Sequence, residues 1–161
     1  MKVIALDLGA KSTGYASWNS VGCRIHYGTW KMPQSENERL YEIYVKIYNL
    51  VCEDDVDAVV YEYVPFQQGK ANQYWHAMRG VLIATCEEYA ITPTPVPQGT
   101  WKKHLVGRAN WGKPKRKADL QNYEAIKALR HAGYGEFETT DEADALGVLL
   151  WYLETEGKQN G

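Results

Sequence analysis

The stretch VIALDL (residues 3–8) opens the chain with a nearly unbroken apolar run, interrupted only by the carboxylate of Asp7. A run of this kind predicts a strand buried on both faces. The pattern returns in DAVVYEYV (residues 57–64), where Glu62 interrupts β-branched and aromatic residues. A carboxylate is costly in a buried strand unless it is paired, hydrated or bound to metal. Asp7 and Glu62 are therefore candidate functional residues, with a solvent-exposed strand end or a turn cap as the alternative for Asp7.

The two strands predict a common site if they lie side by side and run in parallel. Both acids stand near the C-terminal ends of their strands. Open sheets place ligands at that edge. Two acids at matching positions of separate core strands are much less expected by chance than either one alone.

The remaining sequence predicts an α/β protein around these strands. Short turns join the first strand to two more, which gives an antiparallel meander. Apolar periodicity predicts helices, and the proline-containing stretch from Ile91 suits an edge strand. We expect a five-stranded mixed sheet, three antiparallel and then two parallel strands, flanked by helices. One domain would cover residues 1–156, with a flexible tail at 157–161. The further expected elements are strands at 14–20, 23–30 and 91–97 and helices at 35–51, 73–89, 100–106, 117–131 and from 141.

The last predicted helix opens with Asp141-Glu-Ala-Asp144. Residues three apart share a helix face, so Asp141 and Asp144 can point at one ligand, whereas Glu142 is expected to face solvent. The alternative is that these acids compensate the helix dipole. That account does not explain why Asp144 lies on the same inward stripe as Val148 and Tyr152. One functional acid and one capping acid is a further possibility.

Four converging carboxylates, Asp7, Glu62, Asp141 and Asp144, predict a divalent metal site. Without a cation they would repel one another and raise their pKa values. Mg²⁺ takes oxygen ligands and keeps positions open for phosphate. Two such ions, about 3.5–4 Å apart, activate water and stabilise the leaving oxygen of a phosphodiester. We expect two Mg²⁺ ions in the site, with Mn²⁺ able to substitute.

Charge is unevenly distributed along the chain. The net charge is −2, but residues 102–117 contain seven cations and no acid. Removing those seven from the 18 cations leaves 11 against 20 acids, so the remainder carries −9. An acidic body with one basic segment predicts a polyanion held at a defined place, and a solvated loop is the alternative. The seven cations are Lys102, Lys103, Arg108, Lys113, Lys115, Arg116 and Lys117.

Compartment and membrane signals point to a cytoplasmic protein. No apolar run approaches the ~20 residues of a membrane helix, and the N-terminal run is charged too early for a secretory signal. The three cysteines, Cys23, Cys52 and Cys86, show no CxxC spacing, so neither zinc nor a disulfide framework is expected.

Five local sequences occur in order along the chain: Asp7-Leu-Gly-Ala-Lys-Ser-Thr-Gly14-Tyr, strand-borne Glu62, Arg79-Gly80-Val81, Lys102-Lys103-His-Leu-Val-Gly107 and Asp141-Glu-Ala-Asp144-Ala-Leu146. Together they resemble the RuvC-type Holliday-junction resolvases of the RNase H-like superfamily. The resemblance covers residues 1 to about 153 and implies an RNase H-like fold. It also implies a homodimer that binds four-way junctions and makes paired nicks with 5′-phosphate ends.

The resemblance also implies DNA contacts. Lys102 and Lys113 would contact phosphate, with Lys117 competing with Lys113 because the loop is extended. Phe66 resembles the aromatic residue that inserts into the junction, although Pro65 shifts its offset by one. Trp111, in a Gly- and Lys-rich stretch, is expected to stack on bases, whereas Trp101 is expected in the core. The extended basic loop and the shifted offset of Phe66 depart from the family pattern. They indicate a divergent, bacteriophage-type branch, which would act in the host cytoplasm.

Three alternatives stay open. The same fold could cleave flaps or RNA/DNA hybrids, or bind junctions without cleaving them. Retention of all four acids argues against the non-catalytic reading. An actin-like ATPase also carries an Asp-x-Gly turn on its first strand, but normally needs two such domains.

Overall fold

Five strands form one mixed sheet in the order β3-β2-β1-β4-β5 in the computed structural model, which describes residues 1–52, 55–63, 65, 70–107 and 114–155. The three N-terminal strands pair antiparallel, and β4 and β5 add to β1 in parallel. The predicted sheet is therefore confirmed. Its strands are β1 (Lys2–Asp7), β2 (Ser12–Asn19), β3 (Arg24–Lys31), β4 (Ala58–Tyr63) and β5 (Thr94–Pro97).

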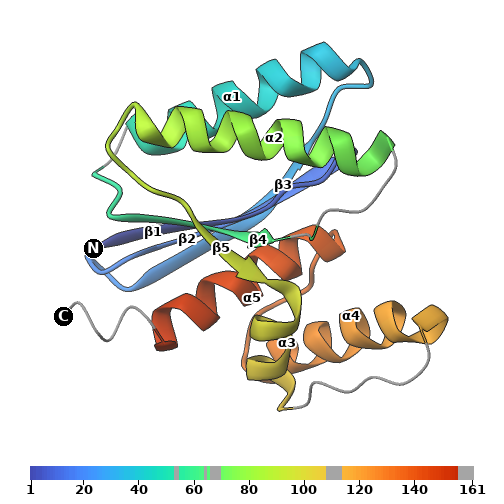
Figure 1. Ribbon diagram of the computed structural model, residues 1–161. Coiled ribbons are helices and arrows are strands. Elements are labelled where there is room, and N and C mark those ends of the chain that lie inside the picture. The colour runs from blue at the N-terminus through green and yellow to red at the C-terminus, as the bar shows by residue number, and fades with distance from the viewer. Residues whose placement is uncertain (53–54, 64, 66–69, 108–113, 156–161) are drawn as a thin grey trace.

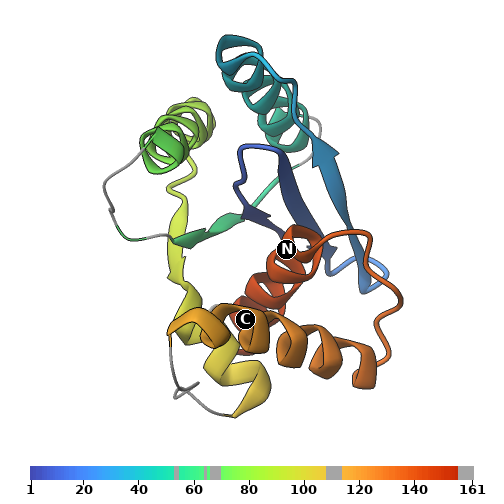
Figure 2. The same cartoon turned by 90° about the vertical axis from the view of Figure 1, so that its right-hand side faces the viewer.

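Helices cover both faces of the sheet (Figures 1 and 2). Two helices pack side by side on one face, and the C-terminal helix crosses the other face with the remaining two beside it. This three-layer arrangement buries both sides of the central strands. The helices are α1 (Glu36–Cys52), α2 (Lys70–Glu87), α3 (Gln98–Val106), α4 (Pro114–His131) and α5 (Thr140–Thr155).

The pleat of β1 divides the apolar side chains between two cores. Because side chains alternate along a strand, Ile4 and Leu6 face the layer of α1 and α2, while Val3 and Ala5 face α5. All four are at most 1% exposed. The apolar run at residues 3–8 therefore reflects burial on both faces, as its composition predicts.

The basic segment is partly helical. Helix α3 includes Lys102 and Lys103 and is capped after Val106 by Gly107, whose φ of 74° is left-handed and suits glycine. Helix α4 begins at Pro114, three residues before the predicted start, since proline is favoured in the first helical turn. Residues 108–113 lie outside the described residues.

Two glycines let α5 approach its neighbours. A Cβ at Gly14 of β2 would lie 1.8 Å from the carbonyl oxygen of Asp141, and a Cβ at Gly147 would lie 2.4 Å from Trp101. A Cβ at Gly80, within α2, would by contrast meet nothing within 4 Å. Gly14 and Gly147 therefore allow α5 to pack closely against β2 and α3.

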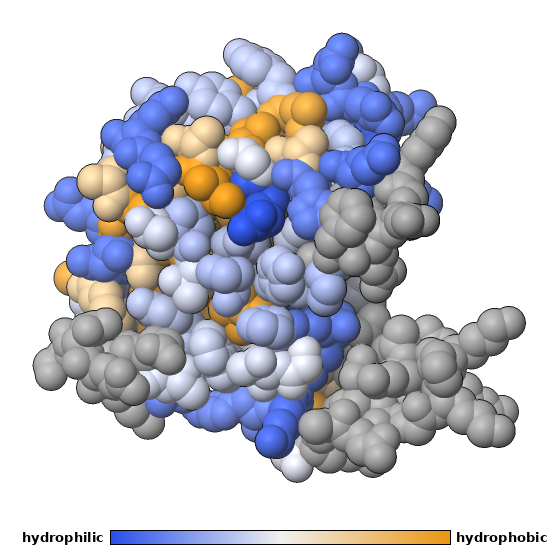
Figure 3. Space-filling view, viewed as in Figure 1, coloured by the Kyte–Doolittle hydropathy of each residue, from blue (hydrophilic) through white to orange (hydrophobic). Residues whose placement is uncertain are grey.

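No helix among the described residues combines the length and apolarity needed to cross a bilayer. The face of the molecule in Figure 3 is largely hydrophilic, with apolar residues in small groups between charged ones.

Candidate metal centre

Asp7 and Glu62 lie next to each other at one edge of the sheet. Strands β1 and β4 are parallel, with Leu6 opposite Tyr61, so the two acids are the next residues along each strand. Glu62 is only 3% exposed. The predicted juxtaposition of the two strand-borne acids is thus confirmed.

Helix α5 brings a third carboxylate to the same place. Asp144 is 7% exposed, and each of Asp7, Glu62 and Asp144 offers an oxygen within 4.8 Å of the others. We call these three residues the carboxylate cluster. Because Asp144 lies one turn into α5, its position depends on the packing of that helix against β1 and β2.

Asp141 lies beside this cluster rather than among the three converging oxygens. Its Oδ2 accepts a hydrogen bond from the hydroxyl of Ser12, the first residue of β2. Its charge nevertheless contributes to the raised pKa values of Asp7 and Asp144. Ser12 was not identified from the sequence, since a serine in a polar turn carries no signal of a partner 129 residues away.

The expectation that Glu142 faces solvent is wrong. Glu142 is 6% exposed, and its Oε2 accepts a hydrogen bond of 2.9 Å from the backbone N–H of Glu138. Its own N–H donates to Thr139 Oγ1 at 3.1 Å. These contacts cap the start of α5, in a variant of the capping box in which Glu142 accepts from the residue before the Thr139 cap. Helical spacing alone missed this because α5 is buried on nearly all sides from Glu142 to Leu149.

Lys102 places a cation inside the cluster. Its side chain is fully buried, and its Nζ lies 3.1 Å from Asp144 Oδ2. The sequence predicted that Lys102 contacts phosphate as part of a basic surface segment, and it gave no sign that the side chain is buried beside Asp144.

Burial and mutual repulsion disfavour the ionised forms of the cluster. Burial raises the pKa of Glu62 to about 8, with a further contribution from Asp144, while Lys102 and the nearby polar groups of Trp101 and Gln98 act in the opposite direction. Burial also raises the pKa of Asp7 well above its usual range, helped by Glu62. The pKa of Asp144 rises for the same reason, against the opposing charge of Lys102.

The cluster fits a hard divalent cation. Its ligand atoms are all carboxylate oxygens, the type that Mg²⁺ and Mn²⁺ prefer. Glu62 Oε2 is buried and has no hydrogen-bond partner among the described residues. A buried, unpartnered acceptor among other acids is the group that a cation would satisfy.

Comparisons with known proteins give no match to any family model or any curated protein sequence. Solved structures do match. RuvC of Thermus thermophilus superposes with a TM-score of 0.72 at 18% identity over 97% of each chain. The same protein in complex with a Holliday junction substrate gives 0.74 at 19% identity, over 94% of this chain and 92% of that one. The fold is that of the RuvC resolvases. The Holliday junction resolvase of fowlpox virus also matches, with a TM-score of 0.60 at 14% identity over 97% and 99% of the chains.

The structure describes only some of the candidate DNA-binding residues. Lys103 is exposed on α3. Lys115, Arg116 and Lys117 belong to the first turn of α4, but their side chains lie outside the described part of the structure. Arg108, Trp111, Lys113 and Phe66 lie outside the described residues altogether, so the choice between Lys113 and Lys117 stays open. Trp101 is fully buried, as expected for a core residue.

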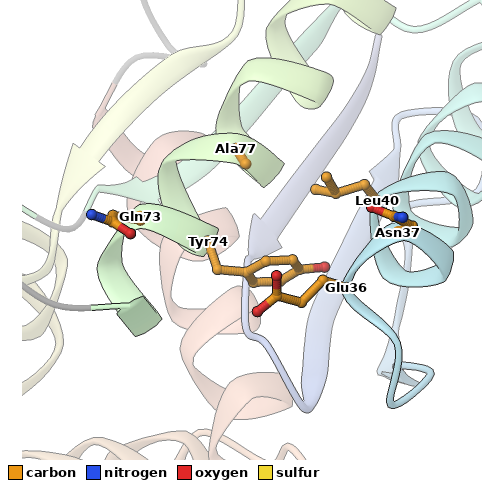
Figure 4. A pocket seen from close by; sticks show the side chains of 6 residues that line it. All are labelled: Glu36, Asn37, Leu40, Gln73, Tyr74 and Ala77. Atoms are coloured by element: carbon orange, nitrogen blue, oxygen red, sulfur yellow. The ribbon is translucent and has the colours of Figure 1, made fainter.

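A pocket of about 330 Å³ opens on the opposite face of this RuvC fold from α5, between α1 and α2. Tyr74 points from α2 toward Glu36 at the start of α1 (Figure 4). The Arg39 guanidinium lies 5.2 Å from the centre of the Tyr74 ring. None of the three cluster acids lines this pocket, so the pocket is separate from the candidate metal site.

The raised pKa values predict that the metal-free protein loses stability as pH rises. Below the usual Glu62 pKa of 4.5 the residue is protonated whether folded or unfolded. Between 4.5 and about 8 the unfolded chain releases a proton that the folded protein retains, so the free energy of unfolding falls. Thermal unfolding in EDTA should therefore show a lower Tm at about pH 8 than at about pH 5.5, and Mg²⁺ should raise Tm more at the higher pH.

Glu62→Gln is the matched control for this pH dependence, because it keeps the shape of the side chain and removes its charge. Its metal-free Tm should change less with pH than that of the wild type. A wild-type Tm in EDTA that stays constant or rises over this range would contradict the raised pKa values.

Proposed function

We propose that this protein is a Mg²⁺-dependent, structure-specific DNA endonuclease that resolves four-way junctions and other branched DNA. The observation that carries the proposal is the convergence of Asp7, Glu62 and Asp144 within 4.8 Å at one edge of the sheet. Burial makes these three charges costly without a cation, which favours a metal site over a purely structural role.

The cluster residues would hold the metal, with Asp141 at its margin. When bound, two divalent ions activate water and stabilise the leaving oxygen of a phosphodiester. Ser12 keeps the Asp141 carboxylate oriented through its hydroxyl. Lys102 fixes Asp144 through the 3.1 Å ion pair, and Gly14 allows α5 to lie close enough for Asp144 to reach the cluster.

The cations of residues 102–117 would supply affinity for the DNA backbone. They begin on α3, which carries Lys102 into the cluster and presents Lys103 to solvent. Phosphate contacts of this kind do not depend on sequence, and they weaken steeply with salt. A basic segment next to a carboxylate site therefore supports a polyanionic substrate.

A four-way junction is favoured over other substrates by the solved structures that share this fold. They include the Holliday junction resolvase of fowlpox virus and RuvC with its junction substrate. We propose that the protein acts as a homodimer, because paired nicks need two sites and the described residues of the chain form one such cluster. The products would carry 5′-phosphate ends.

Two other functions compete with this one. A flap or RNA/DNA-hybrid nuclease would use the same cluster on another substrate, and a junction-binding protein would use the basic segment alone. Cleavage of a mobile four-way junction, a flap and a hybrid should be compared under identical conditions. We expect the junction to be cut at least about tenfold faster than the others, a difference of ~1.4 kcal/mol. Faster cleavage of the hybrid would replace the proposed substrate, and binding without cleavage of any substrate would favour the non-catalytic protein.

A further inference from the structure

The pocket of about 330 Å³ between the N-terminal halves of α1 and α2 has the lining of a ligand site. Leu40 and Ala77 supply apolar walls, and the side chains of Glu36, Asn37 and Gln73 bring polar groups to it from both helices. Small-molecule sites typically measure ~300–1,000 Å³ and combine apolar walls with a few polar groups. The pocket therefore has the size and composition to hold a small flat group.

Tyr74 contributes a buried hydroxyl to this pocket. The residue is 8% exposed, and its side chain points from α2 toward the start of α1 (Figure 4). The hydroxyl oxygen has no hydrogen-bond partner in the part of the chain that the structure describes. Buried hydroxyls are usually hydrogen-bonded, and an unpaired one is costly. A ligand that offers a donor or an acceptor would satisfy this group.

Arg39 keeps the Tyr74 ring in position, and its hydrogen bonds go to the backbone. The guanidinium lies 5.2 Å from the centre of the ring. Its Nε donates to the Pro33 carbonyl at 2.6 Å, and its Nη2 donates to the Gln34 carbonyl. The Glu36 carboxylate lines the pocket itself, so a phosphate would meet a like charge there. The lining therefore suits an uncharged ligand with hydrogen-bonding edges better than an anion.

Among the groups that a DNA nuclease meets, a nucleobase has these properties. It is flat and uncharged, and its edges carry hydrogen-bond donors and acceptors. Asn and Gln amides pair with the edge of adenine, and a carboxylate accepts from the exocyclic amino group of cytosine. Asn37, Gln73 and Glu36 offer these groups, and the Tyr74 hydroxyl can donate or accept. The lining thus favours a base with an exocyclic amino group.

The pocket lies at the same end of the sheet as the carboxylate cluster, although on the other face from α5. Helix α2 follows the end of β4, and α1 begins at the end of the sheet where β1 also ends (Figure 1). The turn after β1 joins the two places, because Ala10, Lys11 and Arg39 line one hollow. Arg39 in turn contacts the Tyr74 ring at the pocket. A DNA strand that leaves the cluster can therefore reach the pocket along this surface.

We propose that this pocket receives one unstacked nucleobase of the DNA strand whose phosphate occupies the carboxylate cluster. The inference rests on the proposed nuclease function and adds a base-binding subsite to it. Extruding a base costs least where pairing is already weakened, which favours a position next to the crossover. Lys11 is exposed between the two places and can pair with an intervening phosphate. The bound base fixes the register of the strand, so cleavage depends on which base lies there.

The test places 2-aminopurine, a fluorescent adenine analogue that brightens when it is unstacked, at successive positions next to the crossover of a four-way junction. Fluorescence is recorded in Ca²⁺, so that binding is measured without cleavage. With the wild-type protein, one position should brighten more than its neighbours. That position identifies the base that enters the pocket.

Ala77→Phe fills the pocket and should abolish this position-specific signal. Ala84→Phe is the matched control, because Ala84 is exposed on the same helix about two turns away, and it should behave as the wild type. In Mg²⁺, an abasic residue at the identified position should slow wild-type cleavage about tenfold, but should change the rate of Ala77→Phe by less than about twofold. No brightening position, or the same one in the wild type and Ala77→Phe, would overturn the inference.

Tyr74→Phe separates recognition from packing. It keeps the ring and removes a buried hydroxyl for which the described residues provide no partner. The free energy of unfolding should therefore be unchanged or higher, whereas the effect of the abasic residue on the cleavage rate should shrink. A loss of stability with an unchanged dependence on the base would give the hydroxyl a structural role and overturn its part in the subsite.

A free nucleotide would offer the same base chemistry as the DNA strand. Thermal unfolding with millimolar deoxyadenosine monophosphate separates the two sources. We expect no change in Tm, because the free nucleotide lacks the contacts that the rest of the strand makes. A rise in Tm that is lost in Ala77→Phe, without a position-specific signal from the junction, would assign the pocket to a free nucleotide and overturn the inference.

This inference and the nuclease proposal fail in different ways, because the fluorescence signal does not depend on cleavage. Mg²⁺-dependent cleavage of the junction by a wild type that gives no position-specific signal would refute the base-binding subsite alone. A position-specific signal without cleavage of any branched DNA would refute the nuclease proposal and leave the pocket to a junction-binding protein.

Discussion

Asp7→Asn should abolish Mg²⁺-dependent cleavage of a four-way junction while leaving junction binding nearly intact. Asp7 lies at the end of β1 beside Glu62, and its oxygen is one of the three that converge. The amide keeps the shape of the side chain but removes the negative charge on the ligand. Because bound metal contributes several kcal/mol to the transition state, we expect the rate to fall on the order of 10³-fold or more. Single-turnover cleavage and gel-shift binding in Ca²⁺ would measure the two effects separately.

Asp57→Asn is the matched control for this substitution. Asp57 precedes β4 at the opposite end of the sheet, where its Oδ2 accepts a hydrogen bond from the backbone N–H of Lys2. Asp57 lies before the start of β4, at the end far from Glu62. The cleavage rate of Asp57→Asn should therefore stay within about twofold of the wild type. Equal loss of cleavage in both variants, or full cleavage by Asp7→Asn, would remove Asp7 from the site.

Gly14→Ala should destabilise the protein and impair cleavage together. Gly14 pairs with Asp7 across β1 and β2, and an added Cβ would lie 1.8 Å from the Asp141 carbonyl oxygen. Backbone cannot move aside as a flexible side chain can, so the start of α5 must shift. We expect a loss of about 3 kcal/mol in the free energy of unfolding, at the upper end of the cost of overpacking. Because Asp144 moves with α5, the cleavage rate of the folded variant should also fall.

Gly99→Ala provides the comparison. A Cβ at Gly99, in the first turn of α3, meets nothing within 4 Å. Alanine is the better helix former, so this variant should be unchanged or more stable by up to about 1 kcal/mol. Urea unfolding of both variants would measure the difference. Equal stability of Gly14→Ala and wild type would show that α5 does not depend on this close approach.

The strand-borne acids could be predicted because each breaks a local pattern. Asp7 and Glu62 interrupt apolar strands, and the sheet edge that they share follows from parallel pairing. The order of strands and helices was predictable for the same reason, since apolar periodicity is local in the sequence. The ends of α2, α3 and α4 differ from the prediction by a few residues, because the exact end of a helix depends on capping contacts with nearby residues.

The rest of the site depends on contacts between distant segments. Glu142 is buried because α5 is enclosed on nearly all sides, which helical spacing cannot reveal. Lys102 appeared to belong to a solvated basic segment, yet it pairs with Asp144, 42 residues away. Gly14 and Gly147 permit close packing of α5, but their sequence neighbourhoods do not distinguish them from Gly80.

We propose that the carboxylate cluster makes this protein a metal-dependent junction nuclease. The most direct measurement is the mapping of cuts in an end-labelled synthetic four-way junction, with Mg²⁺ and with EDTA. We expect paired, symmetric nicks near the crossover, with 5′-phosphate ends, in Mg²⁺ alone. Cleavage that persists in EDTA, or an intact junction in Mg²⁺ despite demonstrable binding, would contradict this assignment of function.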